Sequence, residues 1–483
     1  MLLRADVRWI RGSMWITAIG MVVACAGPGS SGSGGQAAQQ PVVKKVISAA
    51  APGNFHTVSS LLAVSGTGTA TPGIAESARL LNPGLTGVGQ TADRDALLAE
   101  AVPTTDNRLW KVLPDGRMET TWHIRPNVLW HDGVPFTSDD LLFTAKLVAD
   151  KDLGVPRDRR FDLVENVEAP DPRTITVTWK KPFIEADQLF GSDQYAPLPQ
   201  HLLEQPFTSQ RANFLEIPYF TREFVGTGAF KLGEFDPASH VTLDANDRFV
   251  LGRPKIDQIV VKFIPSPETL VANVIAGSVE LVLGRSVSLQ QGATLREQWH
   301  NGTVYIITAD PRALTPQHQD PTPTIVKNVQ FRKALSYAIN REEMAQSLGA
   351  GLAPAAQVGI ALEDPLYKAV QPGLVTYEYD PRKAVAMIEE IGYSRGADGV
   401  LRDSRNQPIP IGLRATEREV NIGVVLAAAD YWKRIGIQAD PEIVSEARVT
   451  EREWYARFPS FRTGGGGYAG LSTLDRVRPE QVP

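Results

Sequence analysis

Apolar residues along the chain follow two different periods, and segments of the two kinds alternate through most of the sequence. The segment TITVTW at 174–179 alternates threonine with apolar residues, a pattern typical of a strand with one buried face. The later segment DPRKAVAMIEEIGY instead places Ala384, Ile388 and Ile391 along one side of a helix. Helical and extended segments that alternate and are joined by short loops predict a mixed α/β fold, with helices packed against sheets.

Residues that begin and end helices stand at the expected places around these segments. Ser266 occupies an N-cap position, Pro267 follows at the first helical position, and Gly277 ends the helix before the next strand. Asp380 and Pro381 give a second helix the same kind of start. No internal repeat of supersecondary size accompanies these elements, so a repeat architecture is not expected.

The length and charge of the chain limit the class of protein. A chain of 483 residues exceeds what one simple core organises, so we expect two or three domains or lobes. Its 43% hydrophobic and 21% charged residues are ordinary for a soluble globular protein. The 49 basic and 54 acidic residues give a net charge of −5, which disfavours a nucleic-acid partner because such a partner needs a basic face.

The N-terminus has the pattern of a secretory signal. Arg4, Arg8 and Arg11 precede the apolar run SMWITAIGMVVA, which ends at Cys25, the one cysteine of the chain. This run has 12 residues, whereas a transmembrane helix needs roughly 20. The letters VVAC resemble the bacterial lipobox, so residues 1–24 are predicted to be a lipoprotein signal peptide and Cys25 the acylated mature N-terminus.

A flexible tether is predicted to follow the lipid. Residues 25–42 are rich in Gly, Ser, Ala and Gln, and such a segment buries too little apolar surface to order itself. Because the chain has a single cysteine, the fold must be stable without an internal disulfide. We therefore expect an extracytoplasmic body that is held at a membrane surface by its lipid anchor only.

The stretch WHDGVPFTSDD at 130–140 gathers several residues that could perform chemistry, yet each has a local structural role. Asp132 and the glycine after it form a tight-turn dipeptide. Thr137 stands at a helix N-cap with Asp140 three residues later, close to a capping box. Asp139 and Asp140 fall in the first helical turn, where acids favour the helix dipole. The stretch is therefore predicted to be a structural corner.

An enzymatic interpretation would instead make His131, Asp132 and Asp139 the catalytic groups of a secreted hydrolase. The seven histidines include no pair at i, i+2 or i, i+4, and no thiolate pair is available for a metal. The chain also lacks a GxSxG motif and an SxxK motif with a supporting pattern. The glycine run TGGGGYAG lacks the Lys-Ser/Thr of a phosphate loop. We therefore expect no catalytic residue, no metal site and no cofactor.

Several segments, taken in order, resemble one protein family. The stretch around WHDG resembles a signature of the extracellular solute-binding proteins of family 5, the peptide- and nickel-binding subunits of bacterial ABC importers. The resemblance continues through four further segments, which are GTGAFKLGEFDPASHVTLDANDRFVLGRPKIDQIVVKFI (226–264), ETLVANVIAGSVELV (268–282), VQFRKALSYAINREEM (329–344) and YDPRKAVAMIEEIGY (379–393). One such match would be weak, but five in the right order are specific.

The resemblance implies a two-lobed, periplasmic-binding-protein-like (type II) α/β fold that closes on a solute between its lobes. Lobe one is expected over 43–305, with an accessory subdomain at about 76–200 that contains the WHDG corner. Lobe two is expected over 306–483. Members of the family return to lobe one through a further C-terminal segment, and we expect this return to be missing here.

The resemblance also gives an expectation about the solute. Peptide-binding relatives place an acid in the cleft to hold the ammonium group of the ligand. The corresponding region here, 461–470, carries Arg462 and no acid before Asp475. An unpaired buried ammonium is costly, so the missing acid counts against free peptide amines.

Three residues are candidates for contact with the solute. They are His56 and Thr57, which follow the first strand, and Tyr468 in the glycine loop. With them, the chain is expected to be a monomeric receptor that delivers a peptide-like or other small organic solute to ABC permease subunits. The alternative is a surface sensor or interaction protein on the same fold that feeds no permease, and a secreted hydrolase is the weakest alternative.

The lipid anchor can be tested directly. Metabolic labelling with a palmitate analogue should label the wild-type protein and leave the Cys25→Ala variant unlabelled, because the thiol is the predicted acceptor of the lipid. Equal label on both proteins, or label on neither, would show that Cys25 is not an anchor.

Overall fold

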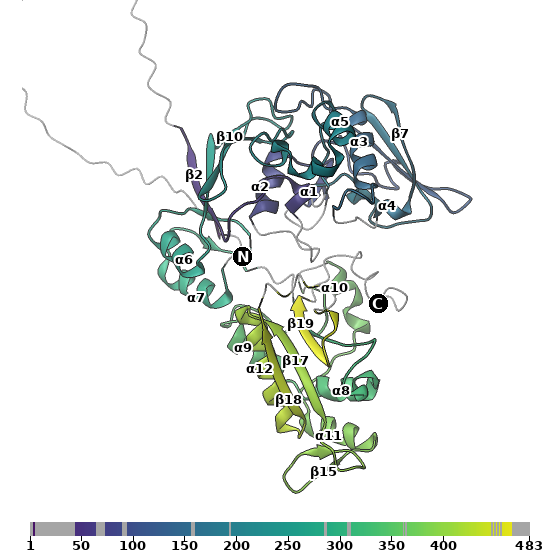
Figure 1. Cartoon of the computed structure of the whole chain (residues 1–483), viewed down its shortest axis with the longest axis vertical. Coiled ribbons are helices and arrows are strands. Elements are labelled where there is room, and N and C mark those ends of the chain that lie inside the picture. The colour runs from purple at the N-terminus through teal and green to yellow at the C-terminus, as the bar shows by residue number, and fades with distance from the viewer. Residues whose placement is uncertain are drawn as a thin grey trace, which may run out of the picture.

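The computed structural model describes residues 44–63, 73–88, 94–155, 160–192, 195–284, 287–306, 311–360, 362, 365–445, 448, 451, 454 and 456–465. For residues 3–4 it describes the backbone only. Cys25, the predicted tether and Tyr468 lie outside these residues. Figure 1 shows two bodies, one above the other: lobe one, which ends at residue 306, and lobe two, which begins at residue 311. No helix within the described residues is long and apolar enough to span a bilayer.

Lobe one is built on a seven-stranded mixed sheet. In spatial order its strands are β13 (Thr303–Val304), β1 (Leu3–Arg4), β12 (Leu281–Val282), β2 (Val46–Ala51), β11 (Gln258–Phe263), β10 (His240–Ala245) and β9 (Phe230–Asp236). One strand, β1, belongs to residues 1–24, which are predicted to be removed as a signal peptide, and the other six belong to the predicted mature chain. The central strand β2 runs parallel to both β11 and β12. Its last residues, Ala49, Ala50 and Ala51, are fully buried, as a strand covered on both faces requires.

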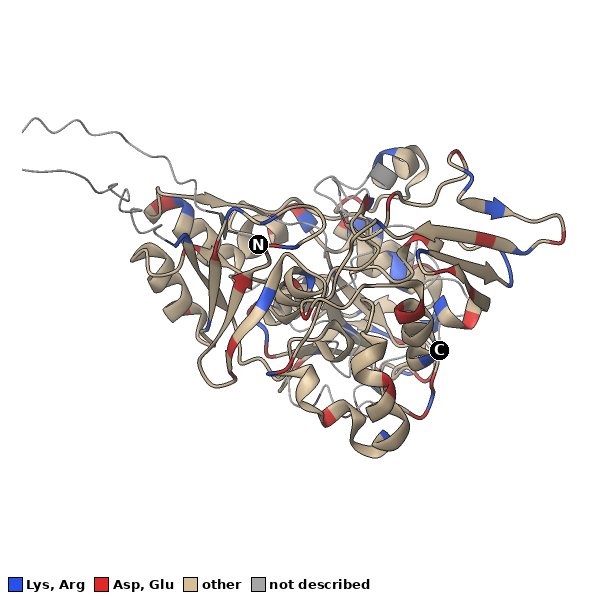
Figure 2. Ribbon diagram, turned by 90° about the horizontal axis from the view of Figure 1, so that it is seen from above, with Lys and Arg blue, Asp and Glu red and all other residues tan. Residues whose placement is uncertain are grey.

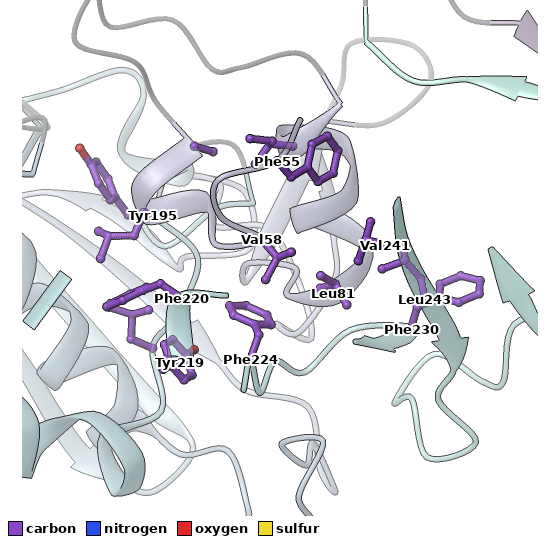
Figure 3. Close-up of a cluster of buried hydrophobic side chains, with 14 of the residues drawn as sticks. Phe55, Val58, Leu81, Tyr195, Tyr219, Phe220, Phe224, Phe230, Val241 and Leu243 are labelled. Carbon is purple, nitrogen blue, oxygen red and sulfur yellow. The ribbon is translucent and has the colours of Figure 1, made fainter. Parts of the chain in front are cut away.

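Helices and a large aromatic core cover this sheet. The helices are α1 (Ser60–Ala63), α2 (Ile74–Leu81), α6 (Pro267–Ile275) and α7 (Leu289–Gln298). The predicted start of α6 is confirmed, because the Ser266 hydroxyl accepts a hydrogen bond of 3.1 Å from the Thr269 amide. Figure 3 shows the core beside α1 and α2, where Phe55, Leu81 and Phe220 converge with Val241 and Leu243 of β10.

The accessory part of lobe one has its own four-stranded antiparallel sheet, in the order β5 (Trp110–Val112), β6 (Met118–His123), β8 (Thr174–Trp179) and β7 (Val164–Asp171). The strand predicted from TITVTW is confirmed, because Ile175, Val177 and Trp179 are buried while the threonines between them are not. The other elements here are β3 (Thr86–Val88), β4 (Arg94–Ala96), α3 (Ser138–Val148), α4 (Arg160–Leu163), η1 (Ala186–Gln188), α5 (Gln200–Ser209), η2 (Arg211–Glu216) and η3 (Pro218–Phe220).

Lobe two has a four-stranded sheet in the order β14 (Arg312–Pro316), β19 (Phe461–Gly465), β17 (Pro410–Thr416) and β18 (Gln438–Val444). Its helices are η4 (Thr324–Lys327), α8 (Val329–Tyr337), α9 (Arg341–Leu348), α10 (Pro365–Val370), η5 (Gln371–Gly373), α11 (Pro381–Glu390) and α12 (Glu419–Arg434), with a small hairpin of β15 (Ser394–Arg395) and β16 (Leu401–Arg402). The predicted face of α11 is largely confirmed, since Ala384 and Ile388 are fully buried and Ile391 is partly buried.

Charge is spread over both lobes. Figure 2 shows basic and acidic residues interspersed along the ribbons, without a region of a single sign. This distribution fits the small net charge of −5.

The corner at 130–140 is organised by Asp140, which is 4% exposed. One carboxylate oxygen accepts hydrogen bonds from the Thr137 amide at 2.9 Å and from the Trp130 indole at 3.1 Å. The other accepts from the Gln200 amide at the start of α5, also at 2.9 Å. Burial raises the pKa of Asp140, whereas these donors act to lower it. The predicted structural role of the corner is thus supported by its hydrogen bonds.

Two adjacent aspartates provide a matched test of this corner. Asp140→Ala should lower the free energy of unfolding by about 3 kcal/mol, because it leaves one buried and two partly buried donors without their acceptor. Asp139→Ala removes an exposed carboxylate one residue earlier and should change the free energy of unfolding by no more than about 0.5 kcal/mol. Urea unfolding of both variants measures this difference, and equal losses would contradict the role given to Asp140.

Candidate functional site

A cavity of about 1250 Å³ lies where α7 of lobe one meets lobe two. In Figure 1, α7 lies directly above α9 and α12. The cavity wall comes from widely separated segments, which are 287–291 at the start of α7, 311–316 around β14, 335–349 from α8 to α9, 353–360 after α9, and 418–424 at the start of α12. Because both lobes contribute to the wall, a solute held here would contact both of them.

The topology of lobe two brings the start of α12 to this wall. Strands β17, β18 and β19 run parallel, so their carboxyl ends meet at one edge of the sheet. Helix α12 begins at Glu419, directly after β17 and its short connecting loop. The carboxyl edge of a parallel sheet is where α/β proteins commonly bind ligands. Arg418 and Glu419 thus reach the cavity from the expected edge.

Much of the wall is apolar. Large side chains from the core of lobe two line the cavity. They are those of Leu314, Leu335, Ile339, Met344, Trp432 and Phe461. The Trp432 and Phe461 rings pack with their centroids 5.2 Å apart. The Trp432 indole nitrogen donates to the Leu335 carbonyl at 3.1 Å, so its one polar atom is already satisfied. An apolar solute surface could therefore be buried against this wall.

Polar groups interrupt the apolar wall at a few points. The arginines that face the cavity are Arg312, Arg332, Arg341 and Arg418, and the acids are Glu268 and Glu419. Positive charge is thus in excess here, although the whole chain is negative. Among the residues that the structure describes, none makes a hydrogen bond with the buried side-chain oxygen of Gln357, which lies in the wall. It is an acceptor that a solute N–H could use.

A hydrogen bond joins the two lobes at the edge of the cavity. The Gln290 side-chain amide on α7 donates to the Leu348 carbonyl at the end of α9, at 2.9 Å. Both residues line the cavity. The side-chain bond can break and re-form without unfolding either helix, as a movement between lobes would require.

Two of the three residues predicted to contact the solute, His56 and Thr57, do not line this cavity. His56 is exposed in lobe one, with its ring nitrogen 3.3 Å from the Leu62 carbonyl, and it does not line the cavity. Thr57 is fully buried, and its hydroxyl donates to the Phe220 carbonyl at 2.7 Å and accepts from the Ser59 amide at 3.1 Å. The structure therefore gives Thr57 a packing role in place of a surface one. Tyr468 lies outside the described residues.

Sequence inspection missed the arginines of the cavity. Arg332 and Arg341 stand in VQFRKALSYAINREEM, which had been singled out only as a pair of lobe-two helices. The available signal was two arginines at the start of successive short helices. It becomes informative only once the fold shows which side of those helices faces a cavity.

His131, the centre of the enzymatic interpretation, is held in the fold by both ring nitrogens. The Gly226 amide donates to Nδ1 at 3.1 Å. Nε2 lies 3.2 Å from the Gly228 carbonyl, which can only accept, so Nε2 carries the proton. Burial, with smaller contributions from Lys231 and Arg248, lowers the pKa of His131 to about 4. A neutral ring with both nitrogens engaged is a structural link.

The acids near His131 do not complete a catalytic group. Asp132 is 2.8 Å from the His201 ring, and Asp139 is exposed on α3. Within the described ranges no cluster of three or more His, Cys, Asp or Glu side chains could hold a metal ion. The hydrolase alternative therefore gains no support from the geometry of this corner.

The His131 link predicts a loss of stability in acid. The folded protein holds the ring neutral down to about pH 4, whereas the unfolded chain takes up the proton near pH 6.5. The contribution of the neutral His131 ring to the free energy of unfolding is complete above pH 6.5 and falls by about 3 kcal/mol as the pH drops to 4. Chemical unfolding at several pH values should show this fall in the wild type and not in His131→Asn. Parallel curves for the two proteins would rule out His131 as the source.

Comparison with known proteins begins with the family model described as bacterial extracellular solute-binding proteins, family 5 Middle, which matches residues 97–471. A Brucella ovis protein whose name describes it as a peptide-binding protein of an ABC transporter is 26% identical over 316 residues. The matched residues are 65% of this chain and 55% of that protein. The chain thus spans little more than half the length of this curated relative.

Two solved structures share the fold over most of the chain. Oligopeptide-binding AppA from Bacillus subtilis, in complex with a nonapeptide, has a TM-score of 0.65 at 20% identity and is matched over 91% of this chain and 83% of its own. NikA from Brucella suis, in complex with Fe(III)-EDTA, has a TM-score of 0.71 at 18% identity, over 91% and 85%. At such identities the likeness shows the two-lobed fold alone.

Proposed function

Because the chain belongs to family 5 of the bacterial extracellular solute-binding proteins, we propose that it is a receptor that captures a peptide-like or other small organic solute and delivers it to an ABC permease. The observation that carries this proposal is the cavity with walls from both lobes. A solute in that position bridges the lobes, so its contacts favour the closed arrangement over an open one.

The separate cores of the two lobes support a closing movement. One hydrophobic core lies around β2 in lobe one and the other around α12 in lobe two. Two bodies with separate cores can move relative to each other with little change inside either one.

The lipid anchor completes the proposal. A lipid on Cys25 and the tether of residues 25–42 would hold the receptor at the outer face of the cell membrane, near its permease. The tether lets the receptor reach a permease without inserting into the bilayer. Tethering also raises the effective concentration of receptor at the permease, which compensates for a weak contact between the two.

The nature of the solute is constrained by one end of lobe two. Strand β19, FRTGG at 461–465, carries an arginine and no acid. An ammonium group beside this strand would find no carboxylate on it, so a free amine of the solute would have to reach Glu268 or Glu419 elsewhere in the wall. The two fold relatives described above hold a nonapeptide and an iron chelate, so the fold by itself does not determine the solute.

Blocking the cavity tests the proposal. Protein purified from its native host should retain a solute that native mass spectrometry detects. Ala345→Trp, which places a large ring in the cavity wall, should lower that occupancy by about tenfold, since it fills space the solute needs. Ala272→Trp on α6 is the matched control, because Ala272 is exposed and does not line the cavity. Equal occupancy in both folded variants, or no retained solute in the wild type, would contradict the proposal.

A further inference from the structure

One strand of the main sheet of lobe one comes from residues that are predicted to be removed. Strand β1 lies between β12 and β13 and pairs with both of them in antiparallel orientation. Leu3 is opposite Val282 on one side and opposite Val304 on the other. Because neighbouring strands lie about 4.8 Å apart, β12 and β13 are separated by about 10 Å, the room for one strand. Removal of residues 1–24 would leave this place, which we call the strand slot, without its strand.

The strand slot borders the core of lobe one. Val282 is fully buried and Val304 is 8% exposed, and both belong to one hydrophobic cluster with Leu295 and Trp299. The other edge of β12 is already paired with β2. Main-chain groups beside two such buried valines are costly to leave without hydrogen bonds. Because directly paired residues share one face of a sheet, the slot favours a strand with an apolar residue between the valines.

The end of β19 leads toward the strand slot. Strands β14 and β19 are antiparallel, with Arg312 opposite Gly465. In the sequence, only seven residues separate β13 from β14. A segment that follows Gly465 alongside that connection would therefore reach β13 in antiparallel orientation, which is the orientation that β1 has in the slot. In Figure 1 the arrowhead of β19 points toward lobe one.

The chain beyond β19 is long enough to reach β13. Val304 lies eight positions before Arg312, so an extended pairing would bring the residue eight positions after Gly465 opposite Val304. That residue is Thr473, and a shift of one position places Leu474 there instead. Eighteen residues follow Gly465, so the segment needed lies within the chain.

The sequence around this point suits a strand. LSTLDRV at 471–477 contains no glycine or proline and has an apolar residue at every third position. Its Leu474–Asp475 pair has the same order of apolar and charged residue as Leu3–Arg4 in β1. The Arg296 side chain on α7 donates to the Val304 carbonyl at 3.5 Å, so a positive charge lies close to the place that Asp475 would take.

The tether is a less suitable occupant of the strand slot. Residues 25–42 contain five glycines and two prolines, which disfavour a strand. The tether also leads within a few residues into β2 at Val46, on the far side of β12 from the slot.

From these observations we propose that residues 471–477 take the place of β1 in the mature protein, with Leu474 between Val282 and Val304. The inference rests on the removal of residues 1–24 that the proposed lipid anchor requires. It gives lobe one a short C-terminal connection in place of the longer return that is expected to be missing. Residues 466–470 would then join the lobes beside the first connection, and two adjacent connections form a hinge about which the lobes can open and close.

Hydrogen exchange tests whether the strand slot is filled. Mature protein is purified from its host, and mass spectrometry identifies its first residue. The amides of Leu281–Val282 and Thr303–Val304 should exchange about tenfold more slowly in the wild type than in Leu474→Pro, because proline disrupts the pairing of the inserted strand. Gln481→Pro alters the same tail outside the proposed strand and should keep the wild-type protection.

A cysteine pair identifies the segment that fills the slot. In the mature protein the lipid occupies the thiol of Cys25, so introduced cysteines are the free ones. Thr303→Cys combined with Asp475→Cys should form a disulfide within one chain, because the proposed pairing places these residues opposite each other. Thr303→Cys combined with Gln481→Cys is the control, and its yield should be at least about fivefold lower. A disulfide between two chains would show that a second copy supplies the strand, and equal yields would also contradict the proposal.

The outcomes separate this inference from the function on which it rests. A purified chain that still carries residues 1–24 keeps β1, so the lipid anchor and this inference fall together, while retention of a solute still supports the receptor. A cleaved chain in which the slot amides exchange equally fast with and without Leu474→Pro overturns this inference alone. If Leu474→Pro does not fold, the cysteine pair decides.

Discussion

Lobe one depends on the pairing of two strands that are far apart in the sequence. Strand β2 pairs in parallel with β11 from Val46 opposite Gln258 to Ala51 opposite Phe263. The Lys45 amide extends this pairing with a 2.7 Å hydrogen bond to Asp257, 212 residues away. The accessory sheet lies between these strands in the sequence, so it is an insertion closed by this pairing. Because the entropic cost of closing a loop grows only slowly with its length, so large an insertion is tolerated once the strands pair well.

The insertion needs further attachment, and the corner at 130–140 provides it. His131 connects the corner to Gly226 and Gly228, just before β9, and Asp140 connects it to the start of α5. These are buried polar contacts, which are strong when every partner is present and costly when one is missing. His131, the residue that first suggests catalysis, therefore fastens the corner to the segment before β9.

Local features of the fold were predictable from the sequence, whereas the cavity was not. The caps at Ser266 and Asp380 and the strand TITVTW are set by short-range chemistry, so pattern alone identifies them. Thr57 is a polar residue that directly follows a strand, so an exposed loop position was expected. The structure instead buries it, with its hydroxyl bonded to the carbonyl of Phe220, 163 residues later. The cavity is assembled from segments of both lobes, and no local pattern records which of their faces converge. The domain boundaries given by the resemblance and the lipid on Cys25 stay predictions.

The glycines at 226 and 228 have a mechanical consequence. A Cβ at either position would lie 2.1 Å from a carbonyl oxygen of α2, that of Leu81 for Gly226 and that of Leu80 for Gly228. Main chain therefore rests directly on main chain, with no side chain between them to change rotamer and absorb a displacement. Lobe one is stiff along this seam, whereas the contact from Gln290 to Leu348 is compliant. A displacement of the segment before β9 would therefore be passed directly to α2.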